Sequence, residues 1–192
     1  MIATRPRVLA LAVCLAFSAA LHGAEAQASL TTTPPVPESA DSALLPNYTR
    51  LTPTLAAAGQ PTPEAILALR AMGFKTVVNM RAESEPGVAG EAEAVLAQGL
   101  DYVSVPITAE SFSLAAVAAV QRVLDDPARA PVLLHCGSSN RVGGVWAVIQ
   151  ARTRGLGVEV ALEEGQRAGL HSPAMMDAVR RVLAAAPTPP AK

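Results

Sequence analysis

Short apolar runs alternate with longer helical patterns along the middle of the chain. Three runs have the length and composition of strands, and they lie at 75–80, 102–106 and 131–136. The last run is almost continuously apolar, which is typical of a strand covered on both faces. Because a helical pattern precedes each run, we expect βαβ units with parallel strands. The predicted fold class is therefore α/β, with a mostly parallel central sheet and helices on both faces.

The expected helices show apolar residues at intervals of three and four positions. The first has the clearest boundaries, with Thr62 as N-cap, Pro63 at the first helical position and Gly73 as its end. Six helices are predicted, at 62–73, 90–99, 113–126, 141–153, 158–168 and 173–183.

The first 28 residues have the pattern of a secretory signal peptide. Arg5 and Arg7 precede an apolar run at 8–20, and "AEAQA" at 24–28 offers small residues for cleavage. The apolar run is shorter than the roughly 20 residues of a spanning helix. We therefore expect residues 1–28 to be removed, the mature protein to be periplasmic or secreted, and no stable membrane insertion after cleavage.

Two segments are rich in proline and poor in apolar residues. Residues 29–43 read as a flexible linker and residues 184–192 as a flexible tail. The expected folded domain, 44–183, lies between them.

Composition excludes several classes of protein. The chain is 51% hydrophobic and 16% charged, which is a globular balance. Its formal net charge of −1 gives no electrostatic reason to expect nucleic acid as a partner. One cysteine and two distant histidines, His135 and His171, do not form a zinc pattern, so we expect no metal and no cofactor.

The cysteine count directs attention to one thiol. Cys14 leaves with the signal peptide, so the mature chain carries Cys136 alone and has no internal disulfide. An unpaired thiol in an oxidising compartment is exposed to oxidation and cross-linking. The alternative is a buried cysteine that serves as a small apolar residue.

The residues after Cys136 indicate an anion-binding loop. Cys136 ends the apolar run, and Arg141 begins the next helix, where open α/β sheets place their ligand sites. Backbone N–H groups at a helix N-terminus favour an anion, and the same field favours the thiolate of Cys136 as a nucleophile. Arg141 offers a planar fork to a tetrahedral anion. The predicted anion-binding loop comprises Gly137, Ser138, Ser139, Asn140 and Arg141.

Three further roles are expected around this loop. Gly137 allows a tight turn, and Ser138 or Ser139 caps the helix. His135 is a supporting residue that packs under the strand and hydrogen-bonds a carbonyl or the loop, and a role as a base is the alternative. Gly143 and Gly144 let the helix pack closely on the sheet, and ordinary packing of small residues is the alternative.

The stretch "HCGSSNR" resembles the loop of cysteine-dependent protein tyrosine and dual-specificity phosphatases. It is most similar to the phosphatase-like domain of bacterial beta-lactamase-hydrolase-like proteins, and 56–85 and 163–170 share the likeness. The resemblance implies a phosphatase-like fold over about 47–183. It also implies a phosphate monoester or other small anionic substrate, Cys136 as the nucleophile that forms a cysteinyl-phosphate, and Arg141 as the phosphate clamp.

Two departures from the tyrosine phosphatase pattern keep other functions open. The loop is one residue shorter, with four residues between Cys136 and Arg141, and Val142 replaces a hydroxyl residue. This spacing also resembles rhodanese-like sulfurtransferases, in which the cysteine carries a persulfide. A third alternative is an anion-binding domain without turnover.

The acid that protonates the leaving group is the remaining expected role. Phosphatases of this type use an aspartate on a loop upstream of the cysteine, but 106–113 contains only Glu110. Glu110 is therefore the candidate acid, and a solvated surface glutamate is the alternative. Asp101 is expected before its strand, at the opposite end. Loop residues Arg81, Glu83 and Glu85 and helical Arg167 are weaker candidates for the pocket.

Overall fold

A five-stranded sheet forms the centre of the computed structural model, which describes residues 35–185. Its spatial order is β1-β2-β5-β3-β4, in which β2, β5, β3 and β4 are parallel and β1 is antiparallel to β2. This confirms the mostly parallel α/β sheet. The strands are β1 (Thr49–Thr52), β2 (Leu55–Ala58), β3 (Thr76–Asn79), β4 (Asp101–Ser104) and β5 (Val132–His135).

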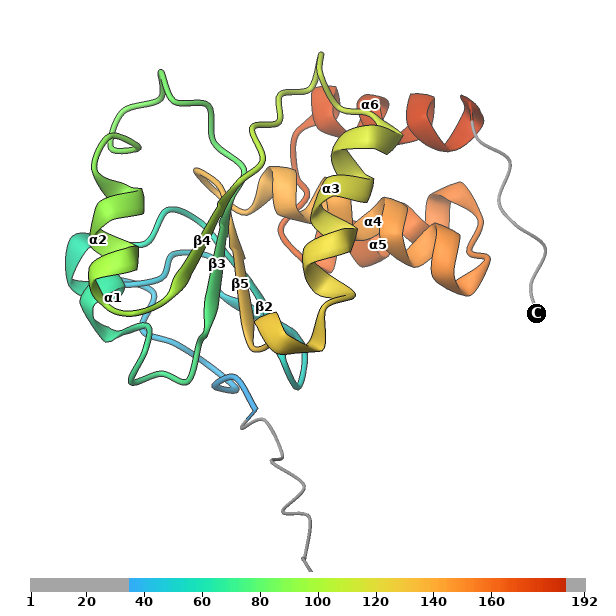
Figure 1. Cartoon of the computed structure of the whole chain (residues 1–192). Coiled ribbons are helices and arrows are strands. Elements are labelled where there is room, and N and C mark those ends of the chain that lie inside the picture. Colours follow the sequence, from blue (N-terminus) through green and yellow to red (C-terminus); the bar gives the residue numbers. More distant parts are fainter. Residues whose placement is uncertain (1–34, 186–192) are drawn as a thin grey trace, which may run out of the picture. The chain divides into compact units, whose positions relative to one another are not determined.

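Helices cover both faces of the sheet. Figure 1 shows α1 and α2 on one face and α3, α4, α5 and α6 on the other. All six predicted helices are present, and a short 3₁₀ helix, η1 (Pro127–Arg129), leads into β5. The α-helices are α1 (Pro63–Ala68), α2 (Glu91–Ala97), α3 (Leu114–Leu124), α4 (Asn140–Arg154), α5 (Val158–Arg167) and α6 (Pro173–Ala185).

The side chains of the central strand β5 lie in two hydrophobic cores, one on each face of the sheet. Val132 and Leu134 pack on the side of α3 to α6, whereas Leu133 packs on the side of α1 and α2. Side chains alternate between faces along a strand. His135 therefore points toward α1 and α2, and Cys136, the next residue, joins the core beneath α4.

The glycines of α4 pack on helices rather than on the sheet. A Cβ at Gly143 would lie 2.3 Å from the backbone nitrogen of Leu170 and 2.5 Å from the carbonyl oxygen of Gly165. A Cβ at Gly144 would lie 3.0 Å from Cγ of Met175 in α6. The expected close approach is real, but the prediction that it brings the helix onto the sheet is wrong. The small residues fix α4 against α5 and α6.

Three details of the chain differ from expectation. Neither β1 nor β2 lies among the three strand-length runs that the apolar pattern predicts. Asp101 is the first residue of β4, opposite Thr76, rather than a residue before the strand, but it does lie at the amino end. Val36 is buried and its N–H donates to the carbonyl of Pro53 at 2.7 Å, so the packed region begins before residue 44 and includes part of the expected linker.

The segments outside 35–185 carry predictions that the structure does not address. Outside the described residues lie the expected signal peptide at 1–28, residues 29–34 of the expected linker and residues 186–192. Ala185, which was expected in the flexible tail, belongs to α6. Among the described residues, no helix combines the length and apolar character needed to cross a membrane.

Candidate active site

Cys136 lies at the base of a loop between the carboxyl end of β5 and the start of α4. It is a free cysteine, only 1% exposed, and it packs against the apolar residues of α4. Its backbone N–H reaches the carbonyl of Ala58 at 3.4 Å, and the carbonyl of Gly137 accepts from the N–H of Gln60 at 3.2 Å. These contacts fix the start of the loop to the end of β2.

The loop presents backbone N–H groups that have no other acceptor. Those of Gly137, Ser138, Asn140 and Arg141 donate no hydrogen bond within residues 35–185. They lie at the N-terminus of a 15-residue helix, whose partial positive charge favours an anion. These groups lie in the loop that the sequence predicts to bind an anion, and anion binding there stays a prediction.

Ser139 shapes the turn from its backbone. It occupies the N-cap position with φ 65°, a left-handed conformation that costs a non-glycine residue roughly 1–2 kcal/mol. Its hydroxyl makes no cap and instead donates to the carbonyl of Ala168 at 2.9 Å, so the expected serine cap is wrong at this position. Gly137 is less constrained than expected, because an added Cβ would only contact Nη2 of Arg141 at 3.5 Å.

Asn140 joins the loop to the segment that precedes α6. Its Oδ1 accepts from the backbone N–H groups of His171, at 2.9 Å, and Ser172, at 3.0 Å. Its Nδ2 donates to the hydroxyl of Ser172 at 2.9 Å. One side chain thus satisfies three polar groups and fixes the rim of the site.

Arg141 pairs with Glu85, a residue from the loop after β3. Nη1 lies 2.5 Å from Oε1 of Glu85, and Nη2 lies 2.8 Å from Oε2. Nη1 also donates to the carbonyls of Met80 and Ile107, each at 3.2 Å. The pKa of Arg141 is raised, first by the hydrogen bonds to Glu85 and then, against the opposing effect of burial, by the negative charge of Cys136.

One edge of the Arg141 guanidinium remains available. The group has five N–H donors, and Nε–H donates to no residue within 35–185, whereas Nη2 makes only the bond to Glu85. The Nε and Nη2 atoms form a planar edge that matches two oxygens of a phosphate. Glu85 therefore occupies one edge and leaves the other without a partner among residues 35–185.

Glu85 is itself held by two arginines. Nε of Arg81 lies 3.2 Å from Oε2, and the backbone N–H of Ala82 donates to Oε1 at 2.8 Å. Hydrogen bonding by Arg141, against the opposing effect of burial and with smaller contributions from Ala82 and Arg81, lowers the pKa of Glu85 from 4.5 to about 2. The carboxylate is ionised throughout the neutral range.

Glu110 is not brought into the pocket. It is exposed, and hydrogen bonding by Thr108 lowers its pKa, which leaves it charged rather than protonated at neutral pH. Thr108 and Ala109 of the same loop do line the pocket, and Arg181 of α6 holds the carbonyl of Ala109 at 2.9 Å. The structure thus agrees with the surface alternative for Glu110.

His135 faces a carboxylate rather than a carbonyl. It is fully buried on the side of α1 and α2, and its Nε2 lies 2.9 Å from Oε1 of Glu91, although the angles are not those of a hydrogen bond. Burial alone would raise the pKa of Glu91, but its contacts with His135, Gln60 and Tyr102 lower it. The expected carbonyl or loop partner of His135 is wrong, and the residue supports the strand from below.

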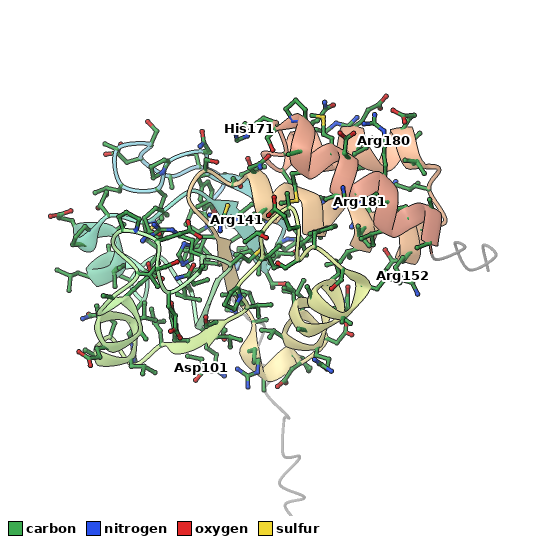
Figure 2. The ribbon with its side chains drawn as sticks, turned by 90° about the horizontal axis from the view of Figure 1, so that it is seen from above. Asp101, Arg141, Arg152, His171, Arg180 and Arg181 are labelled. Atoms are coloured by element: carbon green, nitrogen blue, oxygen red, sulfur yellow. The ribbon has the colours of Figure 1, made fainter. Side chains whose placement is uncertain are left out.

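The pocket beside Arg141 has a volume of about 250 Å³. Figure 2 shows Arg141 in the interior of the view, with Asp101 well away from it and Arg152 and Arg180 toward the helical side. Arg167, the other weak candidate, is exposed and pairs with Glu164 at 3.0 Å. The residues that line the pocket are Glu85, Ile107, Thr108, Ala109, Asn140, Arg141, Ser172 and Met175.

The polar residues that support Arg141 are weakly indicated or not indicated by the sequence. Glu85 and Arg81 are only weak candidates there, and no sequence pattern indicates Gln60 or Glu91. A signal for Glu85 and Arg81 was nevertheless available. β3 and β5 are parallel neighbours, so the loops that follow their carboxyl ends lie side by side. Glu91 gave no signal, since an acidic residue in the first turn of a helix is ordinarily solvated.

Comparison with known proteins identifies the family. Residues 47–153 match the family described as beta-lactamase hydrolase-like protein, phosphatase-like domain. The beta-lactamase hydrolase-like protein of Agrobacterium fabrum is 33% identical over 96 residues, which is 48% of this chain and 22% of that protein. The dual specificity protein phosphatase TpbA of Pseudomonas aeruginosa is 32% identical over 167 residues, covering 85% of this chain and 72% of that protein.

Solved structures show the same fold. A Cys-to-Ser variant of Pseudomonas aeruginosa TpbA, in complex with pTyr, superimposes with a TM-score of 0.61 and 23% identity over 82% of this chain and 94% of that one. A putative phosphatase from Shewanella putrefaciens gives a TM-score of 0.61 and 21% identity over 75% and 95%. With a loop bearing Cys136 and Arg141 on this fold, the chain belongs to the phosphatase-like domain family of beta-lactamase hydrolase-like proteins.

Proposed function

We propose that this protein is an exported phosphatase that hydrolyses phosphate monoesters through a cysteinyl-phosphate intermediate. The observation that best supports the proposal is the position of Cys136 beneath a loop of free N–H groups, with Arg141 beside it. The helix N-terminus and Arg141 favour a bound phosphate and the thiolate together. Family membership supports the same chemistry.

The proposed reaction has two steps. The thiolate of Cys136 attacks phosphorus, the bond from phosphorus to the ester oxygen breaks, and the leaving group departs as a phenolate or alkoxide that takes a proton from solvent. Water then attacks the phosphorus of the cysteinyl-phosphate and loses a proton to solvent, the S–P bond breaks, and inorganic phosphate and the thiolate result. In both steps Arg141 and the loop amides stabilise charge on the phosphoryl oxygens.

The leaving group determines which esters react well. The loop at 106–113 presents no carboxylic acid to the pocket, because Glu110 is exposed and ionised. A phenol with a low pKa departs without a donated proton, whereas an alcohol does not. Aryl phosphates are therefore the proposed substrate class. TpbA has been crystallised with pTyr, which is an aryl phosphate.

Export is proposed from the sequence alone. The basic start, the apolar run and the small residues at 24–28 support removal of residues 1–28 and a periplasmic or secreted mature protein. Intact-mass measurement on protein from the native host should give a chain that begins near Ser29. Retention of Met1 would contradict export by this route.

One experiment distinguishes the phosphatase from the sulfurtransferase and from a binding domain. The mature protein is assayed with an aryl phosphate and, in parallel, with thiosulfate plus cyanide. We expect phosphate release that Cys136→Ser abolishes and Arg141→Lys reduces by about 10²-fold or more, because the planar fork is lost. Arg154→Lys, at the far end of α4, is the matched control. Thiocyanate formation would favour the sulfurtransferase. If neither substrate is turned over, the remaining function is that of an anion-binding domain without catalysis.

A further inference from the structure

A series of hydrogen-bonded polar side chains connects Arg141 to the buried interior of the protein. Glu85 connects Arg141 to Arg81, whose side chain is only 7% exposed. Arg81 Nη1 donates to Oε1 of Gln60, and Nη2 donates to the carbonyl of Pro86 at 2.5 Å. Arg81 thus holds three different acceptors and has one fixed orientation.

Gln60 is the junction of this chain. Its Nε2 donates to Oε2 of Glu91 at 2.5 Å, and its backbone N–H donates to the carbonyl of Gly137 in the nucleophile loop. Glu91 in turn contacts His135 and accepts from the hydroxyl of Tyr102 at 3.2 Å. One residue therefore connects the arginine arm, the buried carboxylate and the loop.

Alternating charge explains how such a chain is tolerated in the interior. Glu91, Arg81, Glu85 and Arg141 carry negative, positive, negative and positive charge in that order. A buried charge is costly unless an opposite charge and hydrogen bonds accompany it. Removing one member leaves its neighbours unpaired, so the members act as a unit.

We propose, on the basis of the proposed function, that Arg81 and Gln60 are positioning residues. They set the phosphate-binding geometry of Arg141 through Glu85. They touch neither substrate nor nucleophile. Arg81 fixes the carboxylate of Glu85 on the Nη1 and Nη2 edge of Arg141, which leaves the Nε and Nη2 edge for the anion. Gln60 holds Arg81 in that orientation and ties it to the loop.

The proposal predicts a change in the pH dependence of anion binding. Arg141 and Arg81 are the charged groups that hold Glu85, and both lower its pKa, Arg141 by the larger contribution. Without Arg81 the pKa of Glu85 rises but stays below its usual value, because Arg141 still pairs with the carboxylate. The affinity for an anion should then begin to fall, on the acid side, at a slightly higher pH than in the wild type.

The test uses Arg81→Met and Gln60→Leu, with vanadate as the probe. Arg154→Met is the matched control, because Arg154 also contacts a glutamine, Gln150 at 3.2 Å, and a glutamate, Glu164 at 3.3 Å, but on the surface. Vanadate affinity is read from protection of Cys136 against iodoacetamide between about pH 3 and 8, a window that extends below the usual glutamate pKa toward the lowered pKa of Glu85. This readout does not require turnover, so it remains valid if the protein is not a phosphatase.

We expect Arg81→Met to weaken vanadate binding by about tenfold or more and to move its acid limit upward, as loss of a charged hydrogen-bond partner implies. Gln60→Leu should weaken binding by a smaller factor, and Arg154→Met should leave both quantities unchanged. If Arg81→Met does not fold, Gln60→Leu decides the question. Folded variants that bind vanadate with the wild-type affinity and pH dependence would overturn the proposal.

Discussion

Arg141 and Glu85 face each other in a two-pronged contact, with Nη1 to Oε1 at 2.5 Å and Nη2 to Oε2 at 2.8 Å. The two residues are separated by 56 positions; Glu85 lies in the loop after β3, and Arg141 lies in the first turn of α4 after the adjacent parallel strand β5. The contact fixes the plane of the guanidinium beside the loop that follows Cys136. The orientation of Arg141 that we propose for phosphate binding is thus present without a ligand.

The pH dependence of stability tests this contact. The pKa of Glu85 is about 2 in the folded protein against a usual 4.5. A carboxyl group whose pKa is lowered by folding stabilises the protein above its unfolded pKa, and the stabilisation is lost as the pH falls through the folded pKa. We therefore expect the free energy of unfolding of the wild type to exceed that of Glu85→Gln at pH 7, and the difference to shrink between about pH 4.5 and 2.

Urea unfolding at several pH values gives this difference. Glu93→Gln, on the exposed surface of α2, is the control for loss of a carboxylate. A difference between wild type and Glu85→Gln that stays constant from neutral to strongly acidic pH would show that the pair contributes nothing through ionisation.

The clamp formed by Asn140 separates stability from anion affinity. Asn140→Ala removes the acceptor of two backbone N–H groups and should cost about 1–3 kcal/mol of stability. Asn140→Asp keeps that acceptor but places a negative charge beside the loop. It should fold more stably than the alanine variant while binding vanadate about tenfold more weakly than the wild type. Equal vanadate affinity in Asn140→Asp and wild type would argue against an anion site here.

Helix packing behind the loop gives a third prediction. A methyl group at Gly143 would lie 2.3 Å from the nitrogen of Leu170, which is backbone and cannot move aside. Gly143→Ala should therefore destabilise the protein by about 1–3 kcal/mol or more. Gly157→Ser is the control, since its site is open and serine is a favoured N-cap. Thermal unfolding in which both variants match the wild type would contradict the packing described.

Leaving-group dependence tests the absence of a placed acid. Rates on a series of aryl phosphates should fall steeply as the pKa of the leaving phenol rises, and alkyl phosphates should scarcely react. Glu110→Gln should change these rates by less than about twofold, because a placed donor would contribute about 10²–10⁴. A shallow dependence that Glu110→Gln makes steep would identify Glu110 as the acid after all.

The sequence predicted the parts of the fold that local patterns determine. The apolar run at 131–136 required cover on both faces, and β5 indeed lies in the middle of the sheet. Thr62 and Pro63 marked the start of α1, and Thr62 accepts from the N–H of Ala65 at 3.1 Å. Strand β1 was missed because its four residues, "TRLT", are only half-buried and pair only with β2.

Site residues that are close in sequence could be predicted. Site residues that only tertiary packing brings together could not. Cys136 and Arg141 share one loop, so their proximity follows from sequence. Glu91 is buried only because α2 packs on the sheet above His135, and no pattern along the chain indicates that contact. Gly143 was recognised as a small residue, but its partner, Gly165, depends on where α5 returns.

The most direct test of the proposed function is to trap the intermediate. The mature protein is mixed with an aryl phosphate, quenched in acid within the first turnover, digested and examined by mass spectrometry. We expect a phosphoryl group on Cys136 in the wild type and none in Cys136→Ser. An unmodified Cys136 during measurable phosphate release, or a persulfide on Cys136 after thiosulfate with no phosphate released from the ester, would contradict it.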